Sequence, residues 1–488
     1  MPMLWKYYLL SLIICSFSGN LFAQNGKDSL IGKYIPRSIP DELPPPVNEP
    51  SSARVSKFLV GEIIIEGNTR TRPNILHREL PFRSGDSVTL TELVSSFEIA
   101  RQQLMNTRLF NEVVVALRSF RGRIVDVNIS VKERWYLFPL PYVKFVDRNL
   151  TEWANQKFST DRLNYGFKLT HYNFTGRNDK FKLWLITGYT KSAQFSYEQP
   201  YADKSMKHGF RIGFSYSQNR EVNYATNRNH QVFLDSSSGI KNFYGNIDYT
   251  YRPGLRTFHT VSLGYRYMKV DPEIINLNPH FLAPGKSLLK QPELSYKIRY
   301  INTDYVAYPL TGWMGEASLT QAGIKKELNM TQLTANYIQS WPLGSNYYFH
   351  TQGYGTLRVP FNQPFINSNF LGYGDFYLRG LENYVIDGVA GILWRNTVRK
   401  KLVSFSVPTF LKSKSHSHVP FTIFAKAYAD LGYSHNKMFD HNTLTNKMLY
   451  SSGFGIDILT FYDFVIRVDY SFNQMGESGM FFHFSNEF

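Results

Sequence analysis

The chain has 488 residues, of which 16% are aromatic, a formal net charge of +16 and a mean hydropathy of −0.30. A chain that is rich in rings and yet polar on average is unusual for a soluble enzyme. It is typical of a transmembrane β-barrel, where lipid-facing apolar residues alternate with polar residues that face the lumen. The charge comes with no Lys/Arg block and no nucleic-acid motif, so we expect no nucleic-acid partner and assign it to a basic lumen or to contact with anionic lipid headgroups.

Residues 1–23 predict a secretory signal peptide. A lysine precedes the apolar run from Tyr7 to Phe17, and small and apolar residues lead to a cleavage site after Ala23. No apolar run of 18 residues follows, so any membrane crossing must use strands. Cys15 is the only cysteine, and cleavage after Ala23 would remove it, which excludes disulfides and cysteine chemistry. The alternative of lipidation at Cys15 is disfavoured because Ile14 stands where a small residue is needed.

Residues 24–57 predict a linker. Six prolines between Pro36 and Pro50 disfavour both helix and sheet, and they favour an extended chain. The alternative to a plain tether is a peptide that docks on a partner.

Residues 58–134 predict a small α+β domain with the order β-α-α-β-β. Thr89 and Glu92 form a capping box at the start of the second helix. The expected elements are a strand at 58–66, helices at 73–80 and from 89, and strands at 112–117 and 123–132. A three-stranded sheet with both helices on one face would leave an exposed edge. Such an edge can bind an extended peptide, although most edges are blunted or covered.

Residues 135–488 repeat a period-two alternation of apolar and polar side chains, as in 210–217, 243–252 and 464–472. Roughly 22 residues per strand and connection give about 16 strands, an even number as bacterial barrels require. We therefore predict a mainly β fold, an antiparallel transmembrane barrel of about 16 strands behind one small α+β domain. The terminal Phe488 looks like the signal by which outer-membrane barrels are recognised for insertion.

The segment 372–381 places one arginine, Arg379, between glycines after an aromatic run. A guanidinium on such a loop can fold back into an enclosed space and hold a carboxylate in a bidentate pair. Asp430, at an expected inward-facing position of a later strand, is the candidate partner. The alternative is a solvent-exposed turn with an incidental arginine.

These segments resemble the BamA/TamA family of outer-membrane assembly proteins. Residues 58–134 resemble its periplasmic POTRA module through 63–71, 109–113 and 127–134. The barrel resembles the family at four further places, which are 173–176 with 197–201, 304–313, the loop-six motif Leu378-Arg379-Gly380-Leu381, and the strand motif Tyr428-Ala429-Asp430-Leu431-Gly432.

The resemblance implies a role for the loop-six residues. In the family the loop-six arginine enters the lumen and pairs with the strand aspartate, so Arg379 would pair with Asp430 and anchor the loop. Leu381 departs from the usual aromatic, and 394–399 lacks a glutamate often found before its arginine. Relatives often carry several POTRA domains, whereas this chain has room for one.

The resemblance also implies a function. The chain would insert and fold barrel proteins in the bacterial outer membrane, with its N-terminal domain in the periplasm. Its partners would be nascent outer-membrane proteins or an exported polypeptide, outer-membrane lipids, and accessory lipoproteins or other membrane subunits. Two alternatives stay open, a polypeptide secretion channel of the two-partner type and a non-catalytic scaffold subunit of an outer-membrane complex.

The expected route is a seam between the first strand, about 136–146, and the last, about 479–488. Strand residues without donors or side chains would weaken the pairing across the seam. The expected seam residues are Pro139, Pro141 and Val143 in the first strand, with Gly476, Gly479 and Phe488 at the last. The alternative is that these residues only end strands at the membrane interface.

No catalytic motif accompanies these features. The sequence has no Walker loop, HExxH, CxxC or GxSxG pattern, so we expect no enzyme, no cofactor and no metal. His416 and His418 fall in a Lys/Ser-rich segment, where a loop is favoured over a metal site. His483 is the only histidine of the last strand and is expected to face the lumen or the interface rather than serve a lipase on the outer face.

Overall fold

The computed structural model describes residues 57–145, 163–324, 328–374, 376–408, 418–437 and 442–485. The expected signal peptide, the linker apart from Lys57, Asp375, His416 and Phe488 lie outside these residues.

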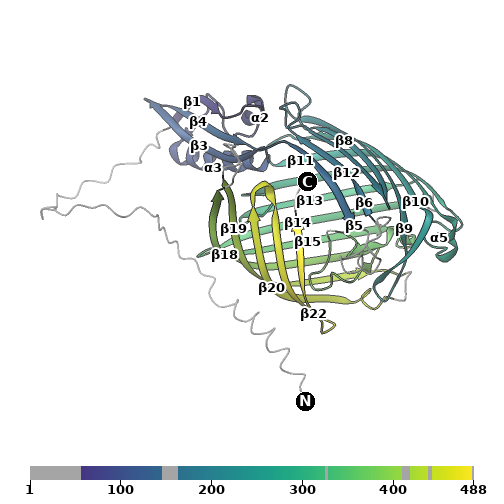
Figure 1. Ribbon diagram of the computed structural model, residues 1–488. Coiled ribbons are helices and arrows are strands. Elements are labelled where there is room, and N and C mark those ends of the chain that lie inside the picture. The colour runs from purple at the N-terminus through teal and green to yellow at the C-terminus, as the bar shows by residue number, and fades with distance from the viewer. Residues whose placement is uncertain are drawn as a thin grey trace, which may run out of the picture. The chain divides into compact units, whose positions relative to one another are not determined.

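The N-terminal part is a four-stranded sheet with two helices (Figure 1). Its elements are β1 (Lys57–Glu66), α2 (Pro73–Arg78), β2 (Ser87–Thr89), α3 (Leu90–Asn106), β3 (Phe110–Arg121) and β4 (Ile124–Glu133). The strands lie in the order β2-β1-β4-β3, with β1 parallel to β4. The expectation of three strands is therefore corrected, because β2 pairs with Lys57–Leu59 at one edge. Three residues are too few for an alternating pattern to reveal a strand.

Helix α3 begins where the capping box predicts. The Thr89 side chain accepts from the Glu92 N–H at 3.2 Å, and the Glu92 carboxylate accepts from the Thr89 N–H at 2.8 Å. These bonds satisfy two of the helix's orphan donors. Leu93 and Leu104 then pack at 0% exposure into the core that covers the sheet, so the capping box and the apolar stripe together place the helix.

The remaining strands form one antiparallel sheet of 16 strands, which confirms the predicted fold class. Their bounds are β5 (Leu137–Phe145), β6 (Leu163–Tyr172), β7 (Lys180–Gly188), β8 (Lys191–Gln199), β9 (His208–Asn227), β10 (His230–Tyr251), β11 (Thr257–Val270), β12 (Leu288–Thr303), β13 (Gly312–Ala322), β14 (Met330–Gly344), β15 (Tyr347–Val359), β18 (Ala390–Pro408), β19 (His418–His435), β20 (Met448–Thr460), β21 (Val465–Asn473) and β22 (Ser478–Ser485). A short helix, α5 (Pro272–Leu277), connects β11 and β12, and two short strands, β16 (Asn369–Leu371) and β17 (Ile386–Asp387), pair with each other.

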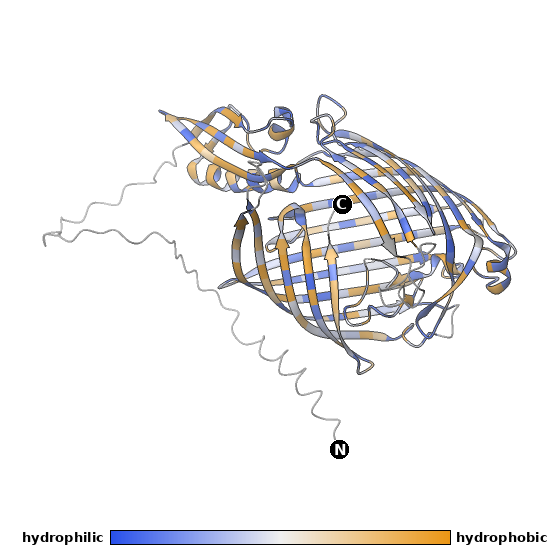
Figure 2. Cartoon of the chain, in the orientation of Figure 1, coloured by the Kyte–Doolittle hydropathy of each residue, from blue (hydrophilic) through white to orange (hydrophobic). Residues whose placement is uncertain are grey.

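The two faces of the sheet differ in polarity, as Figure 2 shows by the alternating colours along the strands. In β10, Phe243 and Ile247 are exposed on the outside, whereas Asp248 is 2% exposed on the inside. Strand residues alternate between faces, so the period-two pattern of the sequence becomes a lipid-compatible surface around a polar interior. Among the described helices, none has the length and apolarity to cross a bilayer.

Strands β5 and β22 are the two ends of the sheet order (Figure 1). In the described part of the chain β5 pairs with β6 and β22 with β21, and no ladder joins β5 to β22. Gly479 lies in β22 opposite Ser471, as expected. Gly476 was expected to weaken the last strand, but it lies before the first residue of β22 and not within its pairing. It takes a φ of +83° in the turn before β22, a conformation that glycine adopts readily.

Candidate functional site

The candidate site is built around the segment 360–389 between β15 and β18, which we name loop six. The pairing of β16 with β17 brings the two ends of its middle part together. Within that part, Leu381 N–H bonds to the Leu378 carbonyl at 2.9 Å and Tyr384 N–H bonds to the Leu381 carbonyl at 3.0 Å. Gly380 takes a φ of +86°, so the chain reverses directly after Arg379. This local fold aims the Arg379 side chain at the barrel wall.

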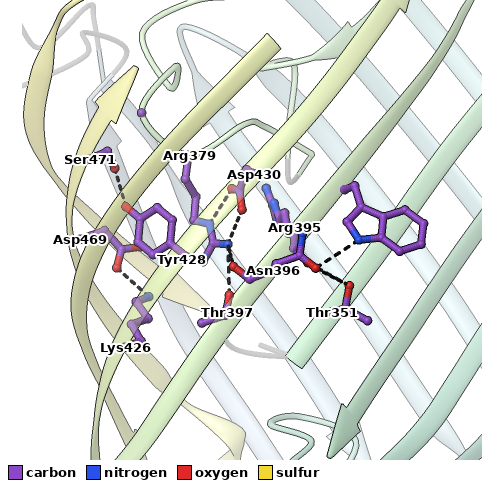
Figure 3. A network of polar contacts seen from close by, with 12 residues as sticks. Thr351, Arg379, Arg395, Asn396, Thr397, Lys426, Tyr428, Asp430, Asp469 and Ser471 are labelled. Atoms are coloured by element: carbon purple, nitrogen blue, oxygen red, sulfur yellow. Dashed lines mark hydrogen bonds and ion pairs between the residues drawn. The ribbon is translucent and has the colours of Figure 1, made fainter. Parts of the chain in front are cut away.

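The structure brings Arg379 and Asp430 together (Figure 3). Arg379 Nε donates to Asp430 Oδ2 at 2.7 Å and Nη2 donates to Oδ1 at 2.5 Å, which is a bidentate pair. Asp430 is 0% exposed and Arg379 8%. The alternative of a solvent-exposed turn is therefore wrong for this arginine.

Neighbouring groups on the barrel wall complete the binding site of the Arg379 guanidinium (Figure 3). Thr397 Oγ1 in β18 accepts a third hydrogen bond from Arg379 at 3.1 Å. The Arg379 guanidinium lies 3.8 Å from the ring centroid of Tyr428, and the Tyr428 hydroxyl is 2.6 Å from Ser471 Oγ. A cation over an aromatic face and a bidentate carboxylate both fix the same planar group. The wall strands β18, β19 and β21 thus hold one loop residue.

Apolar contacts hold the rest of the motif. Leu378 is 1% exposed and Leu381 2%, and both pack in a buried cluster with other loop and wall residues. That cluster consists of Phe370, Leu371, Leu378, Leu381, Ile386, Leu393, Leu444 and Leu449. A Cβ at Gly432 would lie 3.0 Å from Leu378 Cδ1, so the glycine leaves room for the leucine. Leucine at 381 is thus accommodated without the aromatic of the family motif.

A second charged cluster lies on the same wall, and sequence reasoning missed it. Lys426 Nζ lies 2.6 Å from both Asp457 Oδ1 and Asp469 Oδ1, and all three side chains are at most 2% exposed. The Tyr308 hydroxyl donates to Asp457 Oδ2 at 2.7 Å. The sequence does place charged residues at inward-facing strand positions, which was the only sign of this cluster. Their pairing depends on the register between strands, which the sequence does not provide.

Loop six also contacts the last strand. The Tyr377 ring stacks on the His483 ring of β22 with centroids 4.7 Å apart. Glu382 Oε1 lies 3.4 Å from His483 Nε2. Asn473 Nδ2, at the end of the neighbouring β21, donates to the Gly380 carbonyl at 2.8 Å. His483 therefore faces the lumen, as one of the sequence expectations had it.

Four of the expected seam residues lie in the two edge strands, Gly479 in β22 and the other three in β5. Pro139 lies opposite Leu169 and Pro141 opposite Phe167, while Val143 is 67% exposed. Proline fits a paired strand only where its missing N–H faces the unpaired side, and alternate residues direct their backbone groups to the same side. The two prolines therefore remove two donors from the side of β5 that faces away from β6.

No group of three or more metal-ligating side chains occurs among the residues that the structure describes. His418 begins strand β19 opposite Pro408, so the expectation that it lies in a loop is corrected. The long β18–β19 hairpin extends its pairing as far as this residue.

Comparison with known proteins follows the same division of the chain. The family model of the Omp85 superfamily domain matches residues 173–488. The chain belongs to the Omp85 superfamily. In this Omp85 protein residues 58–134 match the POTRA model, described as a surface antigen variable number repeat, so the predicted family is confirmed. The 16-stranded sheet is accordingly an outer-membrane β-barrel. No curated protein shows significant sequence similarity to the chain.

Solved structures of two kinds resemble this Omp85 protein. BamA from Haemophilus ducreyi lacking POTRA domains 1–3 is 17% identical, with a TM-score of 0.47 over 88% of this chain and 84% of that one. CdiB from Escherichia coli is 12% identical, with a TM-score of 0.49 over 90% of this chain and 91% of that one. CdiB from Acinetobacter baumannii is 12% identical, with a TM-score of 0.46 over 88% and 73%.

Proposed function

We propose that this Omp85 protein inserts and folds β-barrel proteins in the outer membrane, using the edges of β5 and β22 as the place where client strands pair. The observation that carries the proposal is that, within the described residues, both strands end the sheet without a ladder between them. A strand entering lipid cannot leave its backbone unpaired, because each orphan group costs several kcal/mol. A free edge lowers that cost for a client, since it offers donors and acceptors at membrane depth.

The chemistry of the β5 edge supports a seam that opens. Pro139 and Pro141 offer no donors on the side away from β6. A closure between β5 and β22 would therefore lack these hydrogen bonds, and it would be weaker than the ladders elsewhere in the barrel. We infer that the seam is the part of the barrel wall that separates at the lowest cost.

A polypeptide secretion channel is the second candidate within the family. It would need a route through the lumen, which loop six occupies with the buried Arg379–Asp430 pair and an apolar cluster. Breaking such a pair typically costs about 3–5 kcal/mol. Because loop six is held in the lumen in this way, we favour the seam over the lumen as the route of the client. A scaffold subunit without insertion activity remains an outcome of the test below.

The test is the folding of a urea-denatured barrel protein into liposomes that contain this protein. The periplasmic placement of residues 58–134 would be assigned in the same vesicles by protease accessibility. We expect folding several-fold faster than in empty liposomes of the same lipid. Equal rates would contradict the proposal, and export of an unfolded polypeptide into the vesicle lumen without folding would support the channel.

A further inference from the structure

A cavity of about 120 Å³ lies between loop six and the inner face of strands β15 and β18–β21. Its lining is dominated by charged side chains, which are Arg379, Arg395, Arg399, Lys426, Arg467, Asp457 and Asp469. Five cations thus face two carboxylates, and Asp430, which pairs with Arg379 behind the lining, adds a third. Among these eight side chains, positive charges exceed negative ones by two.

The carboxylates are already engaged by other groups. Asp430 holds Arg379 in the bidentate pair, and Lys426 lies 2.6 Å from each of Asp457 and Asp469. Arg395, Arg399 and Arg467 are therefore left without an ion pair to any described carboxylate. Arg395 instead donates to the Tyr377 carbonyl, and Arg399 Nη1 donates to the Pro309 carbonyl at 3.2 Å.

Donor groups of these arginines are unsatisfied inside the protein. The Nε atoms of Arg395 and Arg399 are buried and have no acceptor among the described residues. Arg399 is 8% exposed, so it is largely withdrawn from the open lumen. Arg467 takes part in the strand ladder through its backbone. Its side chain makes no hydrogen bond or ion pair with any residue that the structure describes. Excess positive charge inside a protein is costly, and a negatively charged acceptor in the cavity that bonds to the Nη donors of these arginines would offset the cost.

We propose that this cavity binds one small tetrahedral oxyanion, inorganic phosphate or sulfate, between Arg395, Arg399 and Arg467. Guanidinium groups match the geometry of such oxygens with paired N–H donors. A cavity of about 120 Å³ has room for an ion of this size. The bound ion fastens β18 to β21 underneath loop six. The inference is independent of whether the protein inserts clients or exports them.

The test uses the full chain in detergent and radiolabelled inorganic phosphate in equilibrium dialysis. We expect saturable binding of about one phosphate per chain, with sulfate competing. Arg399→Gln and Arg467→Gln should each weaken binding at least tenfold. Arg220→Gln is the matched control, because Arg220 lies in β9 beside Asp235, outside the cavity, and should leave binding unchanged.

A variant that is expected to bind phosphate more tightly controls for loss of binding through misfolding. Asp469→Asn removes one negative charge from the lining, so we expect tighter phosphate binding, which a folding defect cannot mimic. Competition by glycerol 3-phosphate would indicate a site for the phosphate of a lipid headgroup rather than for a free ion. We expect glycerol 3-phosphate not to compete. Absence of saturable binding, unchanged affinity in both arginine variants, weaker binding in Asp469→Asn, or competition by glycerol 3-phosphate would overturn the proposal.

Discussion

The Tyr377 ring of loop six stacks on the His483 ring of β22, with an angle of 19° between their planes and 4.7 Å between their centroids. Tyr377 stands two residues before Arg379, which is fixed to Asp430 on β19. One short segment therefore joins the wall of the barrel to the strand that ends the sheet. We therefore expect a displacement of loop six to disturb β22, the edge where we propose that client strands pair.

Replacing Tyr377 with alanine should loosen β22. An aromatic pair contributes about 0.5–1.5 kcal/mol, so amide exchange in β22 should rise roughly two- to tenfold while exchange in β19 stays unchanged. Hydrogen–deuterium exchange of the full chain measures both strands at once. Tyr337→Phe is the control, because it removes only an exposed hydroxyl bonded to Gln339 within β14. Unchanged exchange in β22 would show that the stack does not restrain the edge.

Replacing Arg379 with alanine should destabilise the barrel by about 3–5 kcal/mol, because it leaves the fully buried Asp430 without its partner. The temperature at which the barrel loses its compact mobility on a detergent gel reports this loss. The double variant Arg379→Ala with Asp430→Ala should be more stable than the sum of the single changes predicts, since no lone charge remains. Strict additivity would argue against the pair as the anchor of loop six.

Gly380→Ala should lower the same melting temperature. Gly380 has a φ of +86° and a Cβ there would lie 3.0 Å from Ser471 Cβ, so alanine is strained by about 1–3 kcal/mol. Gly374→Ala, in the same loop, meets nothing within 4 Å of its Cβ and should change little. Equal melting temperatures for the two variants would mean that the turn after Arg379 does not determine the position of loop six.

The N-terminal domain should show a pH-dependent stability centred on Asp126. Hydrogen bonds from the Arg121 guanidinium, the Glu62 N–H and the Ser119 hydroxyl hold the pKa of Asp126 well below its usual range. Because the pKa is lowered in the folded state, the stabilisation is present above the unfolded value of about 3.9. It is lost as pH falls below that value toward the folded pKa.

The comparison of wild type with Asp126→Asn tests this expectation by urea unfolding of residues 57–134. Wild type should be more stable at pH 7, and the difference should shrink below about pH 3.9. Glu112→Gln, which breaks an exposed pair with Lys132, should have little effect at either pH. A difference that is constant with pH would mean that the charge of Asp126 is not what stabilises the domain.

The sequence predicted those features of the fold and the site that depend on a pattern within one segment. The Thr89–Glu92 capping box placed the start of α3, and period-two alternation gave both the sheet and the inward position of Asp430. Arg379 was found because glycines frame it and because the motif resembles that of a family. These patterns depend on spacing within one segment, which the sequence contains.

Side-chain contacts that depend on the register between strands could not be predicted from the sequence. Lys426, Asp457 and Asp469 come from three strands, and they meet only because the register between β19, β20 and β21 sets them side by side. The stack of Tyr377 on His483 depends in the same way on where loop six comes to lie. The sequence likewise does not show whether Gly476 weakens the pairing of the last strand or forms the turn before it, because a glycine suits either place.

The most direct test of the account is a disulfide across the seam. Cys15 is the only native cysteine, so in a Cys15→Ser background Val143→Cys can be combined with a cysteine at each of positions 479–484 in turn. A pair forms a disulfide when its Cα atoms come within about 4.4–6.8 Å. The folding assay is then run with the cross-linked protein before and after reduction. We predict that the cross-linked protein loses its acceleration of client folding and that reductant restores it. Full acceleration by the cross-linked protein would contradict insertion through the seam.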